Sequence, residues 1–353
     1  MDKEYQIQLD GFRFLAVSSV MYGHWVPYSY NILKIINTSL SSSGVNMFFV
    51  LSGFLITQIL IKAKEQNADK SSNIFTLKQF YARRFLRIFP LYYLVVIAGY
   101  FLNIPTAKEN ISWYLTYSSN IMWSLTGKNC YVYTHLWSLA IEEQFYLFFP
   151  LLVLFTPKKH LLKAFIFIIF LAIFSRGILY FIFDPKRIWL ISYGLTPCCF
   201  DCFGFGAILA YLKIYKPSLL ESIIKKFYLF LISLLIFIIL SVVRVFHEQS
   251  MYCAIFMRFT MAIFCFWLIG NASLRRYTGI AQKFLENKVI IYLGKISYGL
   301  YVYHYFMTYI NSQFHIGENP LKYFILTILI SIMSWHFYES PFNKLKKYFN
   351  YNK

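Results

Sequence analysis

An arginine and a histidine, Arg13 and His24, stand eleven positions apart in the first apolar stretch of the chain. At about 100° per residue this separation is close to three full helical turns, so both side chains are expected on one helix face, about 16 Å apart along the axis. Ionisable groups are expensive inside a membrane and tend to face a polar cavity. The pair therefore predicts a site that reaches into the bilayer. The structural alternatives are an ion pair of Arg13 with Asp10, three residues earlier, and a hydrogen bond from His24 to a neighbouring helix.

The elements that must position these residues are membrane helices. Of the 353 residues, 58% are hydrophobic and 14% are charged, against about 25% charged in soluble domains. The apolar stretches, most of them near the roughly 20 residues that span a bilayer, predict an all-α, polytopic bundle of about ten transmembrane helices. The expected spans are 12–30, 44–62, 88–104, 136–156, 160–181, 190–212, 226–246, 252–270, 289–310 and 321–338.

The connections between these spans are too short for a soluble domain. Residues 1–353 are therefore expected to form a single integral membrane domain, with no appended soluble domain. The first stretch lacks a small-residue cleavage pattern, which favours a retained helix over a cleaved signal. The connection 105–135 is rich in Trp and Tyr, and part of it is expected at the membrane interface.

The net charge of +19 is unevenly distributed. If the N-terminus is cytoplasmic, the inner connections and the C-terminal segment carry most of the 34 lysines and arginines. This asymmetry follows the positive-inside rule and predicts that both termini are cytoplasmic. Because the charge follows the topology, it argues against the alternative of a basic surface that binds nucleic acid.

Three arginines precede the third span on the inner side. Arg83 and Arg87 are four residues apart and share a helix face, and Arg84 flanks them. The positive-inside rule alone accounts for arginines here. Guanidinium groups also bind phosphates well, so a site for a phosphate-bearing ligand is the functional interpretation.

Carboxylates within the spans are further candidates. Glu142 and Glu143 point about 100° apart, so both are not expected to face one cavity. Asp201 lies near the middle of its span. It is either a functional acid or the partner of Arg176 or Arg258.

Several other residues have a simpler explanation in helix packing or interface preference. They are Ser52, Gly53, Gly204 and Gly206, and the aromatic or imidazole side chains His135, Trp137, Tyr298, Tyr301, Tyr303 and His304. The last four could also line an outer sugar site. Five of the six cysteines fall in apolar spans, and Cys199 and Cys202 have no further ligand nearby, so no metal is expected.

Six segments carry a family resemblance. They are LDGFRFLAV at 9–17 with His24, GVNMFFVLSGFLIT at 44–57, FYARRFLRIFPLYY at 80–93, HLWSLAIEEQFYLFFPLL at 135–152, LGKISYGLYVYH at 293–304 and FYESPFNKL at 337–345. In this order, over almost the whole chain, they resemble the acyltransferase 3 family, multi-spanning membrane enzymes that acylate cell-surface sugars. The chain resembles the members that consist of the membrane domain alone.

The resemblance implies an O-acyltransferase, most simply an O-acetyltransferase, in the inner membrane of a bacterium. The acyl donor would be cytoplasmic acetyl-CoA, and the acceptor would be a hydroxyl of a cell-surface or lipid-linked polysaccharide such as lipopolysaccharide O-antigen. His24 would be the general base, because imidazole can take a proton from a sugar hydroxyl. Arg13 would hold a phosphate, a carbonyl or an acid.

The resemblance also assigns the remaining candidates. Glu142 would orient His24 or balance the charge of its protonated form, or it would pair with an arginine for stability alone. The three arginines Arg83, Arg84 and Arg87 would bind coenzyme A. Asn46 stands where the family often has an acidic residue. An asparagine cannot take up a proton, so a family role for a carboxylate does not transfer to this position.

The competing class is a transporter or exporter of sugars or lipids, since buried His, Asp and Glu also occur in proton-coupled carriers. The sequence shows no inverted repeat, which argues against a carrier. The sequence does not identify the acceptor glycan, its hydroxyl or the oligomeric state. It also leaves open whether the donor carries an acetyl or a larger acyl group, and whether transfer is direct or proceeds through an acyl-enzyme.

Overall fold

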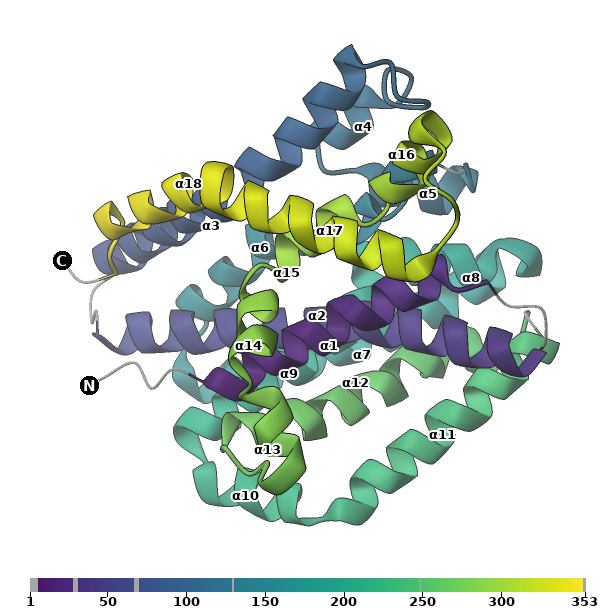
Figure 1. Cartoon of the computed structure of the whole chain (residues 1–353). Coiled ribbons are helices and arrows are strands. Elements are labelled where there is room, and N and C mark those ends of the chain that lie inside the picture. Colours follow the sequence, from purple (N-terminus) through teal and green to yellow (C-terminus); the bar gives the residue numbers. More distant parts are fainter. Residues whose placement is uncertain (1–5, 28–30, 67–69, 129, 248, 352–353) are drawn as a thin grey trace.

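The computed structural model describes residues 6–27, 31–66, 70–128, 130–247 and 249–351, and within these ranges the chain is helical with no strand. The longer helices are α1 (Ile7–Trp25), α2 (Asn31–Gln66), α3 (Lys70–Phe101), α6 (Leu136–Phe155), α7 (Lys158–Ile182), α9 (Phe200–Tyr215), α11 (Phe227–Phe246), α12 (Met251–Ser273) and α17 (Pro320–Ser334). The shorter ones are α4 (Ile111–Leu115), α5 (Ser119–Thr126), α8 (Pro185–Gly194), α10 (Pro217–Lys225), α13 (Gly279–Leu285), α14 (Lys288–Lys295), α15 (Ser297–Tyr303), α16 (Phe306–Phe314) and α18 (Ser340–Lys344). The prediction of an all-α membrane bundle is confirmed (Figure 1).

Eight segments of the described chain are long and apolar enough to cross a membrane. They match eight of the ten expected spans. The other two are 12–30 and 289–310. The first corresponds to α1, whose polar residues lower its hydropathy, and its expected end at 28–30 lies outside the described residues. The second is divided into α14, α15 and α16.

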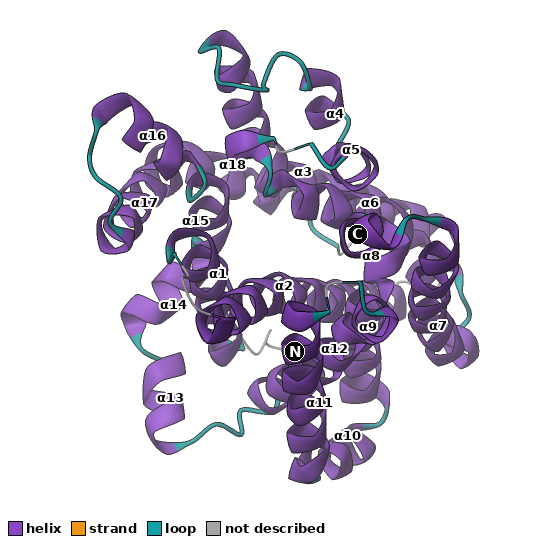
Figure 2. Ribbon diagram, turned by 90° about the vertical axis from the view of Figure 1, so that its right-hand side faces the viewer, coloured by secondary structure: helices purple, strands orange, loops and turns teal. Residues whose placement is uncertain are grey.

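Helix α1 lies against α2 and α14 near the middle of the bundle (Figures 1 and 2). Its apolar residues Ala16, Val17 and Val20 are buried. A Cβ on Gly44 would contact Val20 and the Ala16 carbonyl, so the two helices approach closely at this level. This packing fixes the face of α1 that carries its polar residues.

Two expected boundaries differ from the structure. Helix α3 begins at Lys70 and runs through Pro90, whereas the expected span begins at residue 88. The three arginines that precede the expected span, Arg83, Arg84 and Arg87, therefore lie within this helix. The expected span 190–212 is interrupted after α8 by a 3-10 turn, Thr196–Cys199, where Pro197 cannot continue the hydrogen-bond ladder.

Close packing of α2 on α9 is confirmed at the predicted glycines. A Cβ on Gly53 would collide with the Phe203 backbone, and one on Gly206 with the Val50 carbonyl. Gly204 instead faces Ile169 of α7. These contacts hold α2 rigidly against the rest of the bundle.

Several tyrosines of the aromatic connection 105–135 pack on the bundle. Tyr114, Tyr117 and Tyr133 are buried, and Tyr117 stacks on Tyr92 of α3 with ring centroids 4.0 Å apart. Trp113 is the more exposed aromatic, at 38%. These contacts attach the segment to α3, and the interfacial position expected of part of it stays a prediction.

The beginning of α1 and the end of the described chain lie at the same end of the bundle (Figure 1). Arg83 of α3 donates hydrogen bonds to the Lys346 and Phe349 carbonyls, which ties the C-terminal segment to this end. We call it the basic end. The opposite end carries α4, α5, α8 and α16 (Figure 1).

Candidate active site

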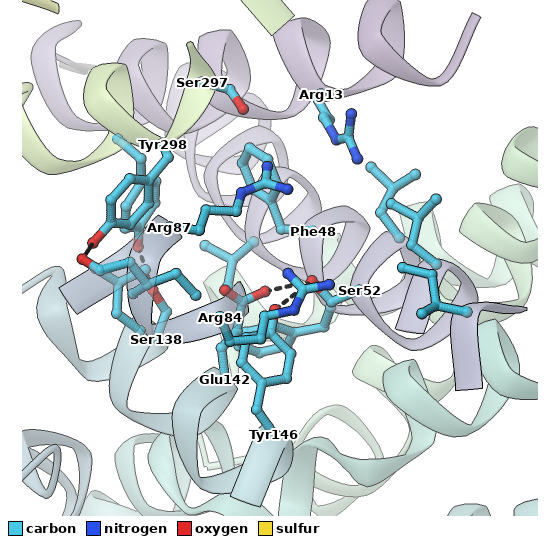
Figure 3. A pocket seen from close by; sticks show the side chains of 18 residues that line it. Arg13, Phe48, Ser52, Arg84, Arg87, Ser138, Glu142, Tyr146, Ser297 and Tyr298 are labelled. Atoms are coloured by element: carbon cyan, nitrogen blue, oxygen red, sulfur yellow. Dashed lines mark hydrogen bonds between the residues drawn. The ribbon is translucent and has the colours of Figure 1, made fainter. Parts of the chain in front are cut away.

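A cavity of about 190 Å³, which we call the inner cavity, lies between α1, α2, α3, α6 and α15 (Figure 3). Its apolar walls come largely from α2, including Val45, Phe48 and Leu55. Its polar groups converge from helices that are far apart in the sequence. They are Arg13, Ser52, Arg84, Arg87, Ser138, Glu142, Tyr146, Ser297, Tyr298 and Tyr301.

Three guanidinium groups line this cavity. Arg13 is paired with Asp10, as the sequence allowed, and still borders the cavity. Arg84 and Arg87, three residues apart on α3, enter from another side, and Arg84 lies over the Tyr146 ring. Arg83 is turned away to the C-terminal segment, so the expected pairing of Arg83 with Arg87 on one functional face is replaced by Arg84 with Arg87.

Glu142 and Ser52 form a hydrogen-bonded pair in the inner cavity. The Ser52 hydroxyl donates to the Glu142 carboxylate at 2.7 Å, and the Tyr146 hydroxyl donates to Ser52 at 3.0 Å. Ser52 was expected to serve helix packing, yet it faces polar groups. Glu143, the neighbour of Glu142, does not line the cavity, which agrees with their divergence on the helix.

A second cavity, the outer cavity, lies towards the other end of α1 and encloses about 270 Å³. His24 is exposed to it, while His135 and Trp137 line it as buried residues. Hydroxyl and amide side chains of α2 line it as well. They are Asn37, Thr38, Ser41 and Ser42.

His24 is held by a second histidine. His24 Nδ1 and His304 Nε2 are 2.9 Å apart, and His304 Nδ1 lies 2.5 Å from the Tyr301 carbonyl oxygen. A carbonyl only accepts, so Nδ1 of His304 carries the proton and its Nε2 accepts. His24 must then donate through Nδ1, and its Nε2 keeps a lone pair.

A third histidine, His135, packs beside the His24–His304 pair. The rings of His135 and His304 have centroids 5.0 Å apart, and both side chains are buried. The Trp25 indole also donates to the His304 backbone carbonyl at 3.2 Å, so α1 is tied to this segment twice. A ring fixed in one tautomer with an exposed lone pair is suited to act as a general base.

Val45 and Tyr301 border both cavities and separate them. The Tyr301 hydroxyl is 2.5 Å from Ser138 Oγ and donates to the His135 carbonyl at 3.1 Å. Arg13 thus faces the inner cavity and His24 the outer one, from the same helix. Glu142 is not brought to His24.

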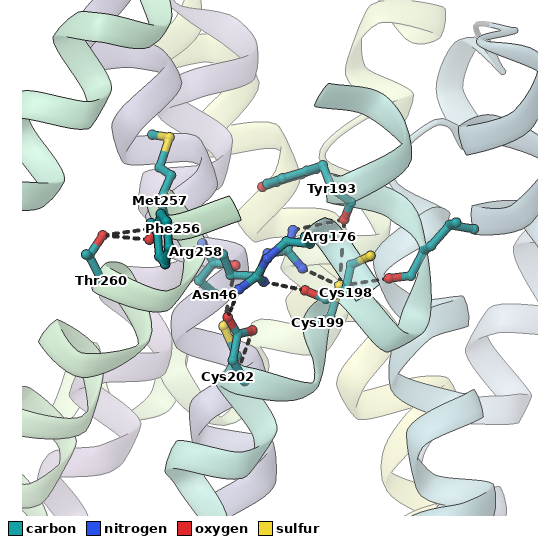
Figure 4. A network of polar contacts seen from close by, with 12 residues as sticks. Asn46, Arg176, Tyr193, Cys198, Cys199, Cys202, Phe256, Met257, Arg258 and Thr260 are labelled. Carbon is teal, nitrogen blue, oxygen red and sulfur yellow. Dashed lines mark hydrogen bonds and ion pairs between the residues drawn. The ribbon is translucent and has the colours of Figure 1, made fainter. Parts of the chain in front are cut away.

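A different polar network contains Arg176, Cys199 and Arg258 (Figure 4), and Asp201 joins it through Arg176. Asp201 pairs with Arg176 at 2.6 Å, and both side chains are fully buried. Arg258 instead contacts Cys199 and donates to the Tyr193 carbonyl. Asn46 accepts from the Cys202 thiol at 3.8 Å and lines neither cavity.

The other tyrosines expected near an outer sugar site lie elsewhere. Tyr298 borders the inner cavity and donates to the Ile88 carbonyl, and Tyr303 donates to Ser334. No group of three or more His, Cys, Asp or Glu that could hold a metal occurs among the residues searched, which are the described ones. All six cysteines are buried and free.

Sequence reasoning missed the pairing of Ser52 with Glu142 and that of His24 with His304. The partners are 90 and 280 residues apart along the chain, so no helical periodicity connects them. The signal available was residue type alone, since a serine and a histidine stand inside apolar segments.

Comparison with known proteins places this architecture in a family. The profile of the acyltransferase domain matches residues 6–339, so the chain belongs to the acyltransferase 3 family. It is 31% identical over 377 residues to a protein of Staphylococcus aureus (strain MSSA476) named "Putative O-acetyltransferase", covering 96% of this chain and 58% of that protein. It is 27% identical over 371 residues to O-acetyltransferase OatA of Staphylococcus aureus (strain NCTC 8325 / PS 47), covering 95% of this chain and 57% of OatA.

The chain therefore spans less than two thirds of the length of these relatives. No solved structure matches it significantly.

Proposed function

We propose that this chain is a membrane O-acetyltransferase that moves an acetyl group from acetyl-CoA to a hydroxyl of a cell-surface or lipid-linked polysaccharide. Family membership and relatives named as O-acetyltransferases support the reaction class. The observation that carries the mechanism is the His24–His304 contact, because it leaves a free lone pair on the His24 ring at the outer cavity.

Coenzyme A binds at the inner cavity in this proposal. Arg84, Arg87 and Arg13 face one space there, and guanidinium groups form charge-assisted hydrogen bonds with phosphates. Arg83 contributes less to coenzyme A binding, since its guanidinium donates hydrogen bonds to two backbone carbonyls. The apolar α2 wall suits the pantetheine arm.

The acceptor hydroxyl reacts at the outer cavity. His24 Nε2 takes the hydroxyl proton as the oxygen attacks the thioester carbonyl carbon. The C–S bond then breaks, the CoA thiolate leaves, and the proton passes from His24 to the sulfur. Atoms and charge balance with no further reactant.

Direct transfer fits the geometry better than an acyl-serine. Ser52 has an acid partner in Glu142 but lies in the inner cavity, and residues at the levels of Arg13 and His24 are about 16 Å apart along the axis. The thioester reaches His24 by passing Val45 and Tyr301, the residues that border both cavities. Both must move aside during turnover.

The orientation follows the positive-inside rule. The basic end faces the cytoplasm, where acetyl-CoA is made, and the outer cavity faces the opposite side of a bacterial inner membrane. Residues 1–353 act as one membrane domain in this account. The terminal residues themselves lie outside the described ranges.

The test is acetyl transfer by purified protein in detergent, with acetyl-CoA and a surface-glycan acceptor. His24→Ala should abolish transfer while coenzyme A binding persists. His336→Ala, an exposed histidine bonded to Tyr292, is the matched control and should retain activity. Wild-type activity in His24→Ala would overturn the mechanism, and no turnover by the wild type would favour a carrier.

A further inference from the structure

A small cavity of about 10 Å³, which we call the buried pocket, lies among residues of the polar network in Figure 4. Two guanidinium groups line it, Arg176 of α7 and Arg258 of α12. Asn46 and Ser192 line it as well, and no described residue of its lining carries a carboxylate. The volume is enough for a single particle about the size of a water molecule.

The two arginines are charged groups held away from water. Arg176 is 1% exposed and Arg258 is 5% exposed. Both belong to helices that are long and apolar enough to cross a membrane. An unpaired charge is costly in such a setting, so a negative charge is expected close to each guanidinium.

The part of the chain that the structure describes supplies one carboxylate for these two arginines. Asp201 pairs with Arg176 at 2.6 Å. Arg258 instead contacts the Cys199 sulfur and donates to a backbone carbonyl at 2.9 Å. The Cys199 sulfur also lies 3.5 Å from the Leu195 carbonyl oxygen, to which only a neutral thiol can donate. Two guanidinium groups against one carboxylate leave one positive charge in excess.

A hydrogen-bond donor is left over at the buried pocket as well. Arg176 donates through its two terminal nitrogens to Asp201 and to the Cys198 carbonyl. Its Nε is buried and has no hydrogen-bond partner among the described residues. The amide of Asn46 can offer a further N–H at this pocket. A water molecule would satisfy the donor, but only an anion would also balance the charge.

We propose that the buried pocket binds one small monovalent anion, of the size of chloride, between Arg176, Arg258 and Asn46. The anion accepts a hydrogen bond from Arg176 Nε and balances the charge of Arg258. The site lies outside the inner and outer cavities and does not depend on the function proposed above.

The buried pocket stands directly behind the wall of the outer cavity. Ser42, Trp189 and Tyr193 line both spaces. Tyr193 packs against Trp189 and Trp137, with ring centroids 5.0 and 4.9 Å apart. Arg258 lies over the Tyr193 ring, 4.5 Å from its centroid. An anion that holds Arg258 in place supports this aromatic wall, so its removal is expected to destabilise the folded protein.

The test is thermal unfolding of the purified full chain in detergent at constant ionic strength, with chloride replaced stepwise by gluconate, which is too large for the pocket. The unfolding temperature should rise with chloride along a saturating curve, by about 2–6 °C at about a hundred times the dissociation constant. Bromide should substitute for chloride. Equal unfolding temperatures in chloride and gluconate would mean that the pocket holds water only, which overturns the proposal.

A carboxylate placed in the pocket should replace the anion. Asn46→Asp keeps the shape of the side chain and adds a negative charge beside the two arginines, so the unfolding temperature of this variant should no longer depend on chloride. Asn110→Asp, whose side chain bonds the Thr106 carbonyl outside the network, is the matched control and should keep the dependence. An undiminished chloride dependence in Asn46→Asp would reveal a general ion effect and overturn the proposal.

Cys199→Ser distinguishes a bound anion from a thiolate. Serine does not ionise, so under the proposal this variant keeps the chloride dependence of the unchanged chain. A dependence that appears in Cys199→Ser but not in the unchanged chain would identify the Cys199 thiolate as the counter-charge and overturn the proposal. These measurements contain no acetyl-CoA and read no activity, so their outcome is independent of the His24→Ala test.

Discussion

Replacing His304 by alanine is the perturbation that most sharply probes how His24 is held. The variant removes the acceptor of the His24 Nδ1 proton, a contact of 2.9 Å between the exposed His24 ring and the buried His304 ring. Breaking one neutral hydrogen bond costs about 0.5–1.5 kcal/mol, or about 2- to 13-fold in rate. Losing a general base altogether costs about 10²- to 10⁴-fold.

His304→Ala should fall between these limits, with kcat reduced about ten- to a hundredfold, because His24 keeps its ring but loses its fixed tautomer. The KM for acetyl-CoA should change by less than about twofold, since the arginines line the other cavity. His304→Gln offers an amide oxygen to Nδ1 and should recover part of the lost kcat.

The assay is steady-state acetyl transfer in detergent, with thermal unfolding of each variant measured in parallel. A role for His304 in packing alone would lower the Tm of both variants and would give no recovery with glutamine. Unchanged kcat in His304→Ala would refute the tautomer argument.

Three further variants test other parts of the account. Arg87→Ala should raise the KM for acetyl-CoA about ten- to a hundredfold, because a charge-assisted hydrogen bond worth about 1.5–3 kcal/mol is lost. Arg83→Ala should change this KM less than about threefold, and equal effects of the two variants would contradict the assignment of Arg87 to coenzyme A binding. Val45→Trp should block the passage of the thioester from the inner to the outer cavity and lower kcat at least tenfold, while coenzyme A still binds in a filter assay. Retained turnover would mean that the thioester takes another route. Gly206→Ala should lower the stability measured by thermal unfolding by about 1–3 kcal/mol, because the added Cβ meets the α2 backbone. Gly177→Ala, with open space around it, should leave stability unchanged, and equal melting temperatures of the two variants would contradict the close packing of α2 on α9.

Much of the fold followed from hydropathy alone. Eight expected spans coincide with long apolar helices, because a bilayer demands about 20 apolar residues per crossing. The positions at which helices are interrupted were harder to predict. Pro197 ends a helix whereas Pro90 does not, since tolerance of a proline depends on whether neighbouring groups satisfy the freed carbonyls.

The site was predictable only where one helix carries it. Arg13 and His24 share a face of α1, and the structure places them at two cavities on that helix. The choice between Arg83 and Arg84 depended on the C-terminal segment, which occupies Arg83. The partner of His24 depended on packing across 280 residues, which local periodicity does not contain.

Sidedness is the most direct test of the central claim, that the acyl donor and the acceptor enter from opposite ends of the bundle. Proteoliposomes would enclose a membrane-impermeant surface-glycan oligosaccharide, and radiolabelled acetyl-CoA would be added outside. We predict acetylated oligosaccharide in the lumen, formed by the molecules whose basic end faces outwards, and its loss in His24→Ala. Product that forms only when donor and acceptor share one compartment would contradict the account.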